Sequence, residues 1–457
     1  SEIKSLMANK KIRESVTPDI VECKNYLKKG PQVWRNKTLF SNIRRFPKAS
    51  FFQGSIEDLI KKDFKTTKYY EIPFNSKVKK LPDDELVSEF RSLFSSSVRL
   101  RLRADVNIGT ALSGGLDSSS ITYFINKELS KKNNSLKQKT FSSIYTKEDF
   151  RKYDESQYID KVAKYLNVDS YKVEIKSKDV LESYEKLIWA HDYPPEGMPI
   201  QGWLTYKLVK DNGCTISLDG QGADEQLAGY ETFLINYLSH MKLRRFISEI
   251  KKIYKFPYSF FQIFMISFFF ISNRLKLSKL FTFLLKIFFG SSFDPTNRLN
   301  EILYRTFDEN LMTLLFHGDK QSMAWSVETR LPYMDFRLVE FLANLPNDLK
   351  IRDGWTKYIN RKALESRIPD EIVWRKNKLG WPVPEKEWLE GDLKLWSTQI
   401  INESSFLKKV IKNDLKIYLN RNKTKFIVRK LNLAIWHKLF FDKNYELLQE
   451  SNNLNNL

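Results

Sequence analysis

Hydrophobic and polar positions between residues 76 and 235 switch repeatedly between the period of a strand and the period of a helix. The expected strands cover residues 106–110, 139–145, 170–175 and 215–218, and the expected helices cover residues 82–98, 121–129 and 154–166. Strands that alternate with helices favour right-handed crossovers and a mainly parallel sheet, with ligands at the carboxyl ends of the strands. The pattern therefore predicts an α/β fold built on a parallel sheet.

The pattern changes between residues 240 and 289. A basic, helix-like stretch at 242–255 precedes an uncharged run at 256–273, and a second, mostly apolar run follows at 280–289. The uncharged run has roughly 18 residues, the lower limit for a membrane span, and its proline, glutamine and serines weaken that interpretation. Two interpretations stay open: peripheral contact of residues 242–289 with an anionic membrane surface, and a pair of helices facing the core of a helical domain.

The composition is that of a globular protein with room for a large core, with 457 residues and 29% charged side chains. The net charge of +21 is compatible with nucleic acid, a membrane surface or polyanionic substrates, but the lysines are spread along the whole chain. Cys23 and Cys214 are too few and too far apart for a disulfide framework or a zinc site. We therefore expect a cytoplasmic protein, and the polar first residues do not predict a signal peptide.

The loop at residues 111–120, Ala-Leu-Ser-Gly-Gly-Leu-Asp-Ser-Ser-Ser, stands between an expected strand and the start of an expected helix. Glycines let the backbone approach a phosphate, and serine hydroxyls and helix N–H groups donate to its oxygens. Asp117 would repel a phosphate unless Mg²⁺ lies between them. This Ser-Gly-Gly-x-Asp-Ser pattern resembles the pyrophosphate loop of ATP pyrophosphatases, which cleave ATP between the α and β phosphates.

A second glycine-rich turn, at residues 219–225, follows the expected strand 215–218 and carries acidic side chains. Because the carboxyl ends of parallel strands share one edge, this turn and the serine loop are expected to meet. Asp117 and Asp224 would then share a Mg²⁺ ion. Ser143, near the end of the strand at 139–145, is a candidate wall for adenine.

Five further stretches, together with the serine loop, resemble the synthetase half of class B, glutamine-dependent asparagine synthetases. They are residues 218–225, 319–335, 355–359, 369–372 and 378–381. The resemblance covers most of residues 1–395, apart from the apolar insert. It implies an ATP-pyrophosphatase type of parallel sheet, a helical C-terminal portion and a short β-rich N-terminal remnant of a glutaminase domain.

The resemblance also implies a division of the chain into four parts. These are the glutaminase-like remnant at 1–75, the ATP-pyrophosphatase domain at 76–235, the apolar and basic helical insert at 236–295, and the helical remainder at 296–457. Glutaminase domains of this family use an N-terminal cysteine, whereas here Ser1 opens the chain and Cys23 lies too late to be that nucleophile. Ammonia is therefore expected from a missing upstream segment or from a separate glutaminase.

Site residues follow from the same resemblance. The expected ligands of ATP and pyrophosphate are Leu112, Ser113, Gly114, Gly115, Asp117, Ser118, Ser119, Ser143 and Gly220, with Leu112 and Ser143 beside adenine. Lys378 matches the family lysine that neutralises charge on the α-phosphate, with Lys376 as the alternative. Gln221 is expected in the acyl pocket, with Glu328 and Arg330 either in that pocket or in structural ion pairs beside it.

The implied function is an ATP- and Mg²⁺-dependent ligase that adenylates a small-molecule carboxylate and transfers ammonia to it. Aspartate is the leading substrate, which would give asparagine, AMP and pyrophosphate. One alternative is amidation of a surface-polysaccharide or other carboxylate at the membrane. A second is an RNA-modifying ATP pyrophosphatase, against which the acidic turn at 219–225 argues. A homodimer is compatible with the sequence but not indicated by it.

Overall fold

The computed structural model describes residues 2–61, 65–74, 80–132, 137–253, 260–275, 277, 298–376, 379–412 and 423–442. Its centre is a five-stranded sheet in the order β5-β4-β3-β6-β7, in which every neighbouring pair is parallel. The strands are β3 (Ile108–Ala111), β4 (Lys139–Ile144), β5 (Asp169–Glu174), β6 (Ile216–Leu218) and β7 (Glu328–Arg330). The predicted α/β class and its four strands are confirmed, and β7 is an additional edge strand.

The order of the strands creates a switch point between β3 and β6. The chain runs outward from β3 through β4 to β5, then returns to the other side of β3 with β6 and β7. Thr110 of β3 lies in register with Thr140 on one side and Leu218 on the other. The loops that leave β3 and β6 therefore diverge to opposite faces and leave room for a ligand between them.

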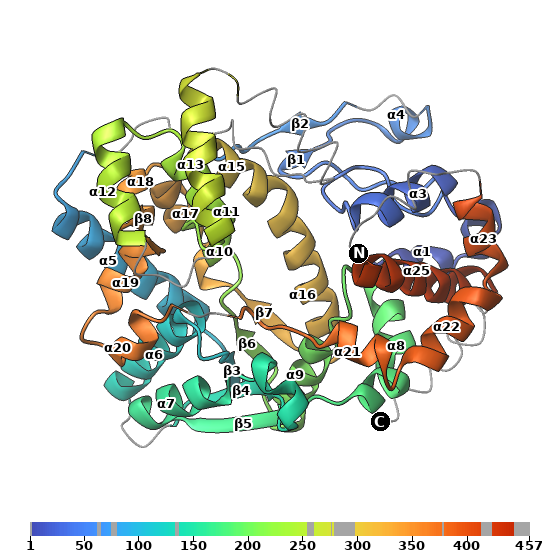
Figure 1. Cartoon of the computed structure of the whole chain (residues 1–457). Helices are drawn as coiled ribbons and strands as arrows, with labels where there is room; N and C mark the ends of the chain where they lie inside the picture. The colour runs from blue at the N-terminus through green and yellow to red at the C-terminus, as the bar shows by residue number, and fades with distance from the viewer. Residues whose placement is uncertain are drawn as a thin grey trace.

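Helices cover both faces of the sheet (Figure 1). One face carries α6 (Leu116–Lys132) and α7 (Ser156–Leu166), and the other carries α9 (Ile200–Asp211) together with α8 (Ser177–His191) and α16 (Met312–Ala324). The predicted first helix is α5 (Asp83–Arg101), which starts directly after Pro82 and buries Leu86, Phe90, Phe94 and Val98 against α6 and its neighbours. Its apolar positions recur every three or four residues, so they form one face.

The N-terminal part is mainly helical in the described residues, which corrects the expected β-rich remnant. It contains α1 (Ile3–Met7), α2 (Lys10–Ser15), α3 (Ile20–Lys29), α4 (Ile56–Ile60) and a pair of two-residue strands, β1 (Ser50–Phe51) and β2 (Thr67–Lys68). Asp19 caps α3 by accepting the N–H groups of Val21 and Glu22. The buried side of α3 packs on α25 (Lys423–His437), near the other end of the chain (Figure 1). Tertiary packing thus holds this segment in a helical form.

The described part of the predicted insert forms a small helical core. It comprises α11 (Thr232–Leu238), α12 (Leu243–Ile253) and α13 (Phe260–Arg274), which pack with α15 (Leu299–Thr306). Phe246 of α12 and Phe270 of α13 stack with ring centroids 3.7 Å apart. Among the described residues, no helix is both long and apolar enough to cross a membrane. The second apolar run, 280–289, lies outside the described residues.

The C-terminal half completes the walls around the sheet with short helices and one hairpin. In chain order these are α17 (Phe336–Ala343), α18 (Asn347–Lys350), β8 (Ile351–Arg352), β9 (Trp355–Thr356), α19 (Tyr358–Leu364), α20 (Asp370–Val373), α21 (Glu385–Glu390), α22 (Lys394–Glu403) and α23 (Ser405–Ile411). The hairpin of β8 and β9 brings the start of α19 toward the switch point. This agrees with the predicted helical C-terminal portion.

Candidate active site

A cavity of about 520 Å³ opens at the carboxyl edge of the sheet, over the switch point between β3 and β6. Its walls come from the loop after β3, the end of β4, the turn after β6, the β8–β9 hairpin, residues 375–376 and residues 379–382. These segments are far apart in the sequence, and the strand order brings them together. The two predicted turns therefore meet in one cavity.

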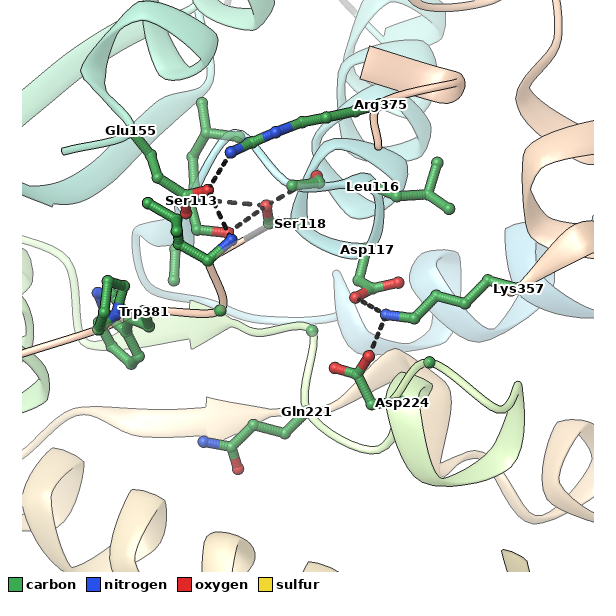
Figure 2. A pocket seen from close by; sticks show the side chains of 18 of the residues that line it. Ser113, Leu116, Asp117, Ser118, Glu155, Gln221, Asp224, Lys357, Arg375 and Trp381 are labelled. Atoms are coloured by element: carbon green, nitrogen blue, oxygen red, sulfur yellow. Dashed lines mark hydrogen bonds and ion pairs between the residues drawn. The ribbon is translucent and has the colours of Figure 1, made fainter. Parts of the chain in front are cut away.

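The serine loop is held in shape by its own hydroxyl groups (Figure 2). The backbone N–H of Ser113 donates to Ser118 Oγ at 3.2 Å, and the two hydroxyl oxygens are 3.1 Å apart. Ser118 Oγ also donates to the carbonyl of Gly115 at 3.2 Å. The loop leads into the first turn of α6, whose N–H groups favour an anion.

Gly114 is needed for packing rather than for the cavity wall. Its φ is +69°, and a Cβ at this position would lie 2.7 Å from Tyr158 Cβ and 2.8 Å from the backbone nitrogen of Ile159. Only glycine lets the loop approach α7 this closely. Ser119 is fully buried beneath the loop. Among the described residues that line the cavity, neither Gly114 nor Ser119 is present, so direct contact with a ligand remains a prediction for them.

Most of the other predicted site residues do line the cavity. They are Leu112, Ser113, Gly115, Asp117, Ser118, Ser143, Gly220, Gln221 and Asp224. At the predicted adenine end, Trp381 Nε1 donates to Ser143 Oγ at 2.6 Å, and Ser142 Oγ donates to the carbonyl of Leu112 at 2.6 Å. Trp381 carried no predicted role, although it belongs to a stretch that the resemblance covers. It adds an aromatic face to that wall.

Glu328 and Arg330 lie elsewhere, which corrects their placement in the substrate pocket. Both are in β7, and Arg330 Nε donates to Glu328 Oε1 at 2.8 Å. Arg330 Nη1 also donates to the carbonyl oxygens of Arg101 and Arg103, each at 2.8 Å. The Glu328 side chain is 58% exposed, and neither residue is among those that line the cavity. Arg330 thus pairs with Glu328 and caps the end of α5. This is the structural ion pair that the sequence left open as the other alternative.

The predicted catalytic lysine, Lys378, lies outside the described residues. Its alternative, Lys376, lines the cavity beside Arg375. Arg375 pairs with Glu155 at 2.5 Å and lies 3.6 Å from the centroid of the Tyr158 ring. This segment therefore presents cations to the cavity, while Arg375 itself ties residues 375–376 to α7.

A lysine that the sequence did not single out stands at the centre of the site. Lys357 Nζ lies 2.5 Å from Asp117 Oδ2 and 2.5 Å from Asp224 Oδ1, and its side chain is 3% exposed (Figure 2). Lys357 has a φ of +54° at the start of α19, a conformation that costs a non-glycine residue about 1–3 kcal/mol. Its stretch belonged to the family resemblance, but the sequence assigned it no function.

Two glycines allow the carboxylates and the lysine to converge. A Cβ on Gly229 would lie closer than 3.0 Å to both the Asp224 carboxylate and the Lys357 side chain. A Cβ on Gly220 would lie 3.2 Å from Asp117 Cβ, where the two turns approach each other. The ion cluster of Asp117, Asp224 and Lys357 can therefore form only because these two positions carry no side chain.

The turn after β6 is fixed by a buried carboxyl group, Asp219. Tyr206 Oη donates to Asp219 Oδ2 at 2.6 Å, and Ser217 Oγ donates to Oδ1 at 2.6 Å. Burial raises the pKa of Asp219, and these hydrogen bonds oppose part of that rise. Burial likewise raises the pKa of Glu225, which accepts a 2.5 Å hydrogen bond from Tyr230 Oη. Asp117 and Asp224, by contrast, form direct ion pairs with Lys357.

Comparison with known proteins agrees with this geometry. The asparagine synthase family profile matches residues 89–449. This chain belongs to the asparagine synthase family. The match begins in α5 and includes every described segment that lines the cavity.

Curated relatives of the asparagine synthase family span much of the chain. Glutamine-hydrolysing asparagine synthetase 1 of Bacillus subtilis is 29% identical over 409 residues, covering 81% of this chain and 62% of that protein. A putative asparagine synthetase of Methanocaldococcus jannaschii is 31% identical over 243 residues, covering 52% and 43%. Amidase chry2 of Gibberella zeae is 25% identical over 394 residues, covering 74% and 58%. The chain therefore spans about three fifths or less of the length of these relatives.

The donor set of the cavity fits a divalent metal. Two carboxylates from different turns point at one cation, the Lys357 ammonium. Mg²⁺ is commonly held by one or two carboxylates, with phosphate oxygens and water completing the coordination. Among the described residues, no cluster of three or more His, Cys, Asp or Glu side chains could hold a metal alone. Asp117 and Asp224 could thus hold Mg²⁺ together with a nucleotide.

Proposed function

We propose that this chain is an ATP-dependent amide-forming synthetase, which adenylates a carboxylate and transfers ammonia to the acyl group. The observation that carries the proposal is the convergence of the serine loop, Asp117 and Asp224 on one cavity at the switch point. Membership of the asparagine synthase family supports it.

The chemistry follows from the groups in the cavity. A substrate carboxylate oxygen attacks the α-phosphorus of ATP, and the bond to the bridging oxygen of the β-phosphate breaks. The serine loop and the first turn of α6 bind the departing pyrophosphate. Bound Mg²⁺ supplies positive charge beside the phosphates. Ammonia then attacks the acyl carbon, AMP leaves with the C–O electron pair, and the new amide loses a proton to solvent.

Lys376 and Lys378 are the two candidates for a cation that opposes charge on the α-phosphate. Lys376 lines the cavity next to the serine-loop wall, and Lys378 is the family's expected lysine. We propose that one of them serves this role, because a fixed cation at a developing anion lowers the barrier.

Aspartate is the leading substrate, but one observation favours a second candidate. The described cations that line the cavity are Lys357, Arg361, Arg375 and Lys376. Of these, Lys357 bridges the two aspartates, Arg361 donates to backbone carbonyls, and Arg375 pairs with Glu155. Among the other described lining residues, Gln221, Tyr230, Leu314 and Trp355 are uncharged, and Glu225 and Glu231 are acidic. This favours a carboxylate whose remaining groups are neutral over a free amino acid with a second charged carboxylate.

The test is formation of AMP and pyrophosphate from ATP, ammonium and a carboxylate, with aspartate compared against neutral-bodied acids such as sugar acids. Asp117→Asn and Asp224→Asn should each lower pyrophosphate release by about 10²–10³-fold, because a carboxylate beside the phosphates is lost. The surface variant Glu328→Gln is the matched control and should retain activity. Release of ADP instead of AMP would contradict the mechanism.

We also propose that ammonia comes from a glutaminase that lies outside residues 1–457.

We further propose that the helical insert contacts an anionic membrane surface. This proposal rests on exposed apolar side chains of α13, where Phe264 is 52% and Ile271 56% exposed. Exposed basic residues on α12, among them Arg244 and Lys251, lie in the same helical subdomain. Apolar and cationic groups together favour binding at an anionic lipid surface.

A further inference from the structure

The cation between the two metal-binding carboxylates belongs to the protein itself. Lys357 Nζ is equally close, 2.5 Å, to Asp117 of the serine loop and to Asp224 of the acidic turn, and it reaches them from the start of α19 (Figure 2). The two carboxylates are largely buried, with side chains 8% and 23% exposed. Two buried anions this close require a positive charge between them.

Contacts of the Lys357 backbone with neighbouring segments fix the position of this residue. Its backbone N–H donates to the carbonyl of Leu227 at 3.1 Å, in the segment that follows the acidic turn. Its left-handed backbone conformation turns the side chain into the cavity, and Gly229 leaves room for its stem. Strained backbone held by its surroundings is a feature of functional positions.

An ammonium group and a divalent metal cannot occupy the same point between the carboxylates. Mg²⁺ would need the oxygens of Asp117 and Asp224 that Lys357 contacts. The lysine stem has four rotatable bonds, so its head can move without any change in the backbone. The phosphates expected at the serine loop would offer the displaced ammonium new anionic partners.

We propose that Lys357 occupies the metal position when no nucleotide is bound, and that it yields this position only to a divalent ion that arrives with ATP. The displaced ammonium then pairs with phosphate oxygens in the same cavity. This inference rests on the proposed function, because it takes ATP and Mg²⁺ as the ligands. Lys357 thereby makes metal binding depend on the nucleotide and restores charge balance after pyrophosphate leaves.

The experiment measures Mn²⁺ binding to the full chain by electron paramagnetic resonance and calorimetry, with and without a non-hydrolysable ATP analogue. The wild type should bind Mn²⁺ tightly only with the analogue. Lys357→Met should bind Mn²⁺ alone at least about tenfold more tightly than the wild type, equivalent to about 1.4 kcal/mol. Lys357→Arg retains the charge and should resemble the wild type. Lys362→Met is the matched control, because Lys362 lies on the same helix and pairs with Glu365 at the surface.

The outcomes separate this inference from the proposed function. If the wild type binds Mn²⁺ alone as tightly as it does with the analogue, the inference is overturned while nucleotide binding stands. This comparison uses only the wild type, so it holds even if Lys357→Met folds poorly. Equal Mn²⁺ affinity of folded Lys357→Met and wild type without nucleotide would also overturn it. If the wild type does not bind the analogue at any Mn²⁺ concentration, the proposed function itself fails.

Discussion

At the scale of single residues, the site depends on small side chains as much as on charged ones. Gly220 lets two turns approach, Gly114 lets the serine loop pack on α7, and Gly229 leaves room for Asp224 and Lys357. The charged residues supply the chemistry, and the glycines set the distances between them. A single methyl group at such a point should therefore have a measurable effect on function.

Gly229→Ala tests this requirement. The added methyl would overlap Asp224 and Lys357, so the ion cluster must shift, and we expect pyrophosphate release to fall by about 10²-fold. Gly213→Ala is the control, since its Cβ would meet nothing within 4 Å although its φ is +71°. That variant should lose only about 1–2 kcal/mol of stability from backbone strain and keep its activity. Equal activity of the two variants would show that the cluster does not need the space at Gly229.

At the scale of elements, a buried polar cluster joins α8 to α16. His191 ends α8, and its ring centroid lies 4.8 Å from that of His317 in α16. Next to them, Asp192 accepts hydrogen bonds from Lys320 Nζ at 3.0 Å and from the backbone N–H of Ile3 at 2.9 Å. Two neutral histidine rings can pack together beside Lys4 and Lys320, whereas charged rings would repel each other and these lysines.

The histidine pair predicts a loss of stability in acid. Burial lowers the pKa of His317 to about 3, and burial, together with His317, Lys4 and Lys320, lowers the pKa of His191 well below its usual value. An unfolded histidine titrates near 6.5, so the unfolded chain binds more protons as the pH falls below this value. The stabilisation that comes from keeping these histidines neutral should therefore be present above pH 6.5. At pH 5.5 the free energy of unfolding should be lower than at neutral pH by about 1.4 kcal/mol per histidine.

Denaturant unfolding of the wild type and His317→Leu between pH 7.5 and 5.5 measures this effect. The variant should show a shallower fall with pH, because it lacks one of the two groups that take up protons on unfolding. An unchanged slope in His317→Leu would mean that this histidine is not held neutral in the fold.

At the scale of the whole molecule, the cavity at the switch point and the helical subdomain are built mainly from different parts of the chain. The subdomain buries one side of α13 through Ile266 and Phe270, while Phe264, Ile271 and Leu275 stay exposed on the other. Two large exposed apolar side chains on α13, with a third directly after its last residue, exceed what scattered surface residues usually show. The net charge of +21 would add attraction to an anionic surface.

Flotation with vesicles that contain anionic lipid tests the proposed membrane contact. The wild type should float with anionic vesicles, and the double variant Phe264→Ser and Ile271→Ser should bind at least about tenfold more weakly, because apolar burial is lost. Leu395→Ser is the control, because Leu395 is an 85% exposed apolar side chain on α22. Equal flotation of all three proteins would contradict the proposed membrane contact.

The sequence predicted the features that local pattern can carry. Strand and helix periods predicted the parallel sheet, and two glycine-rich turns after strands predicted where Asp117 and Asp224 meet. It did not predict β7, because the three residues of this edge strand, Glu-Thr-Arg, are all polar and carry no apolar signal. It placed Glu328 and Arg330 in the substrate pocket as one of two options. A sequence motif does not specify which way the side chains of an edge strand point.

By itself, then, the sequence determined the α/β class, the serine loop and the acidic turn, since each depends on neighbouring residues. Only the tertiary structure decided that Lys357 lies between Asp117 and Asp224, which are 240 and 133 residues away along the chain. It likewise decided that the N-terminal segment is helical, through packing on α25. Contacts between distant segments depend on strand order and backbone direction, and no local pattern of residue types specifies these.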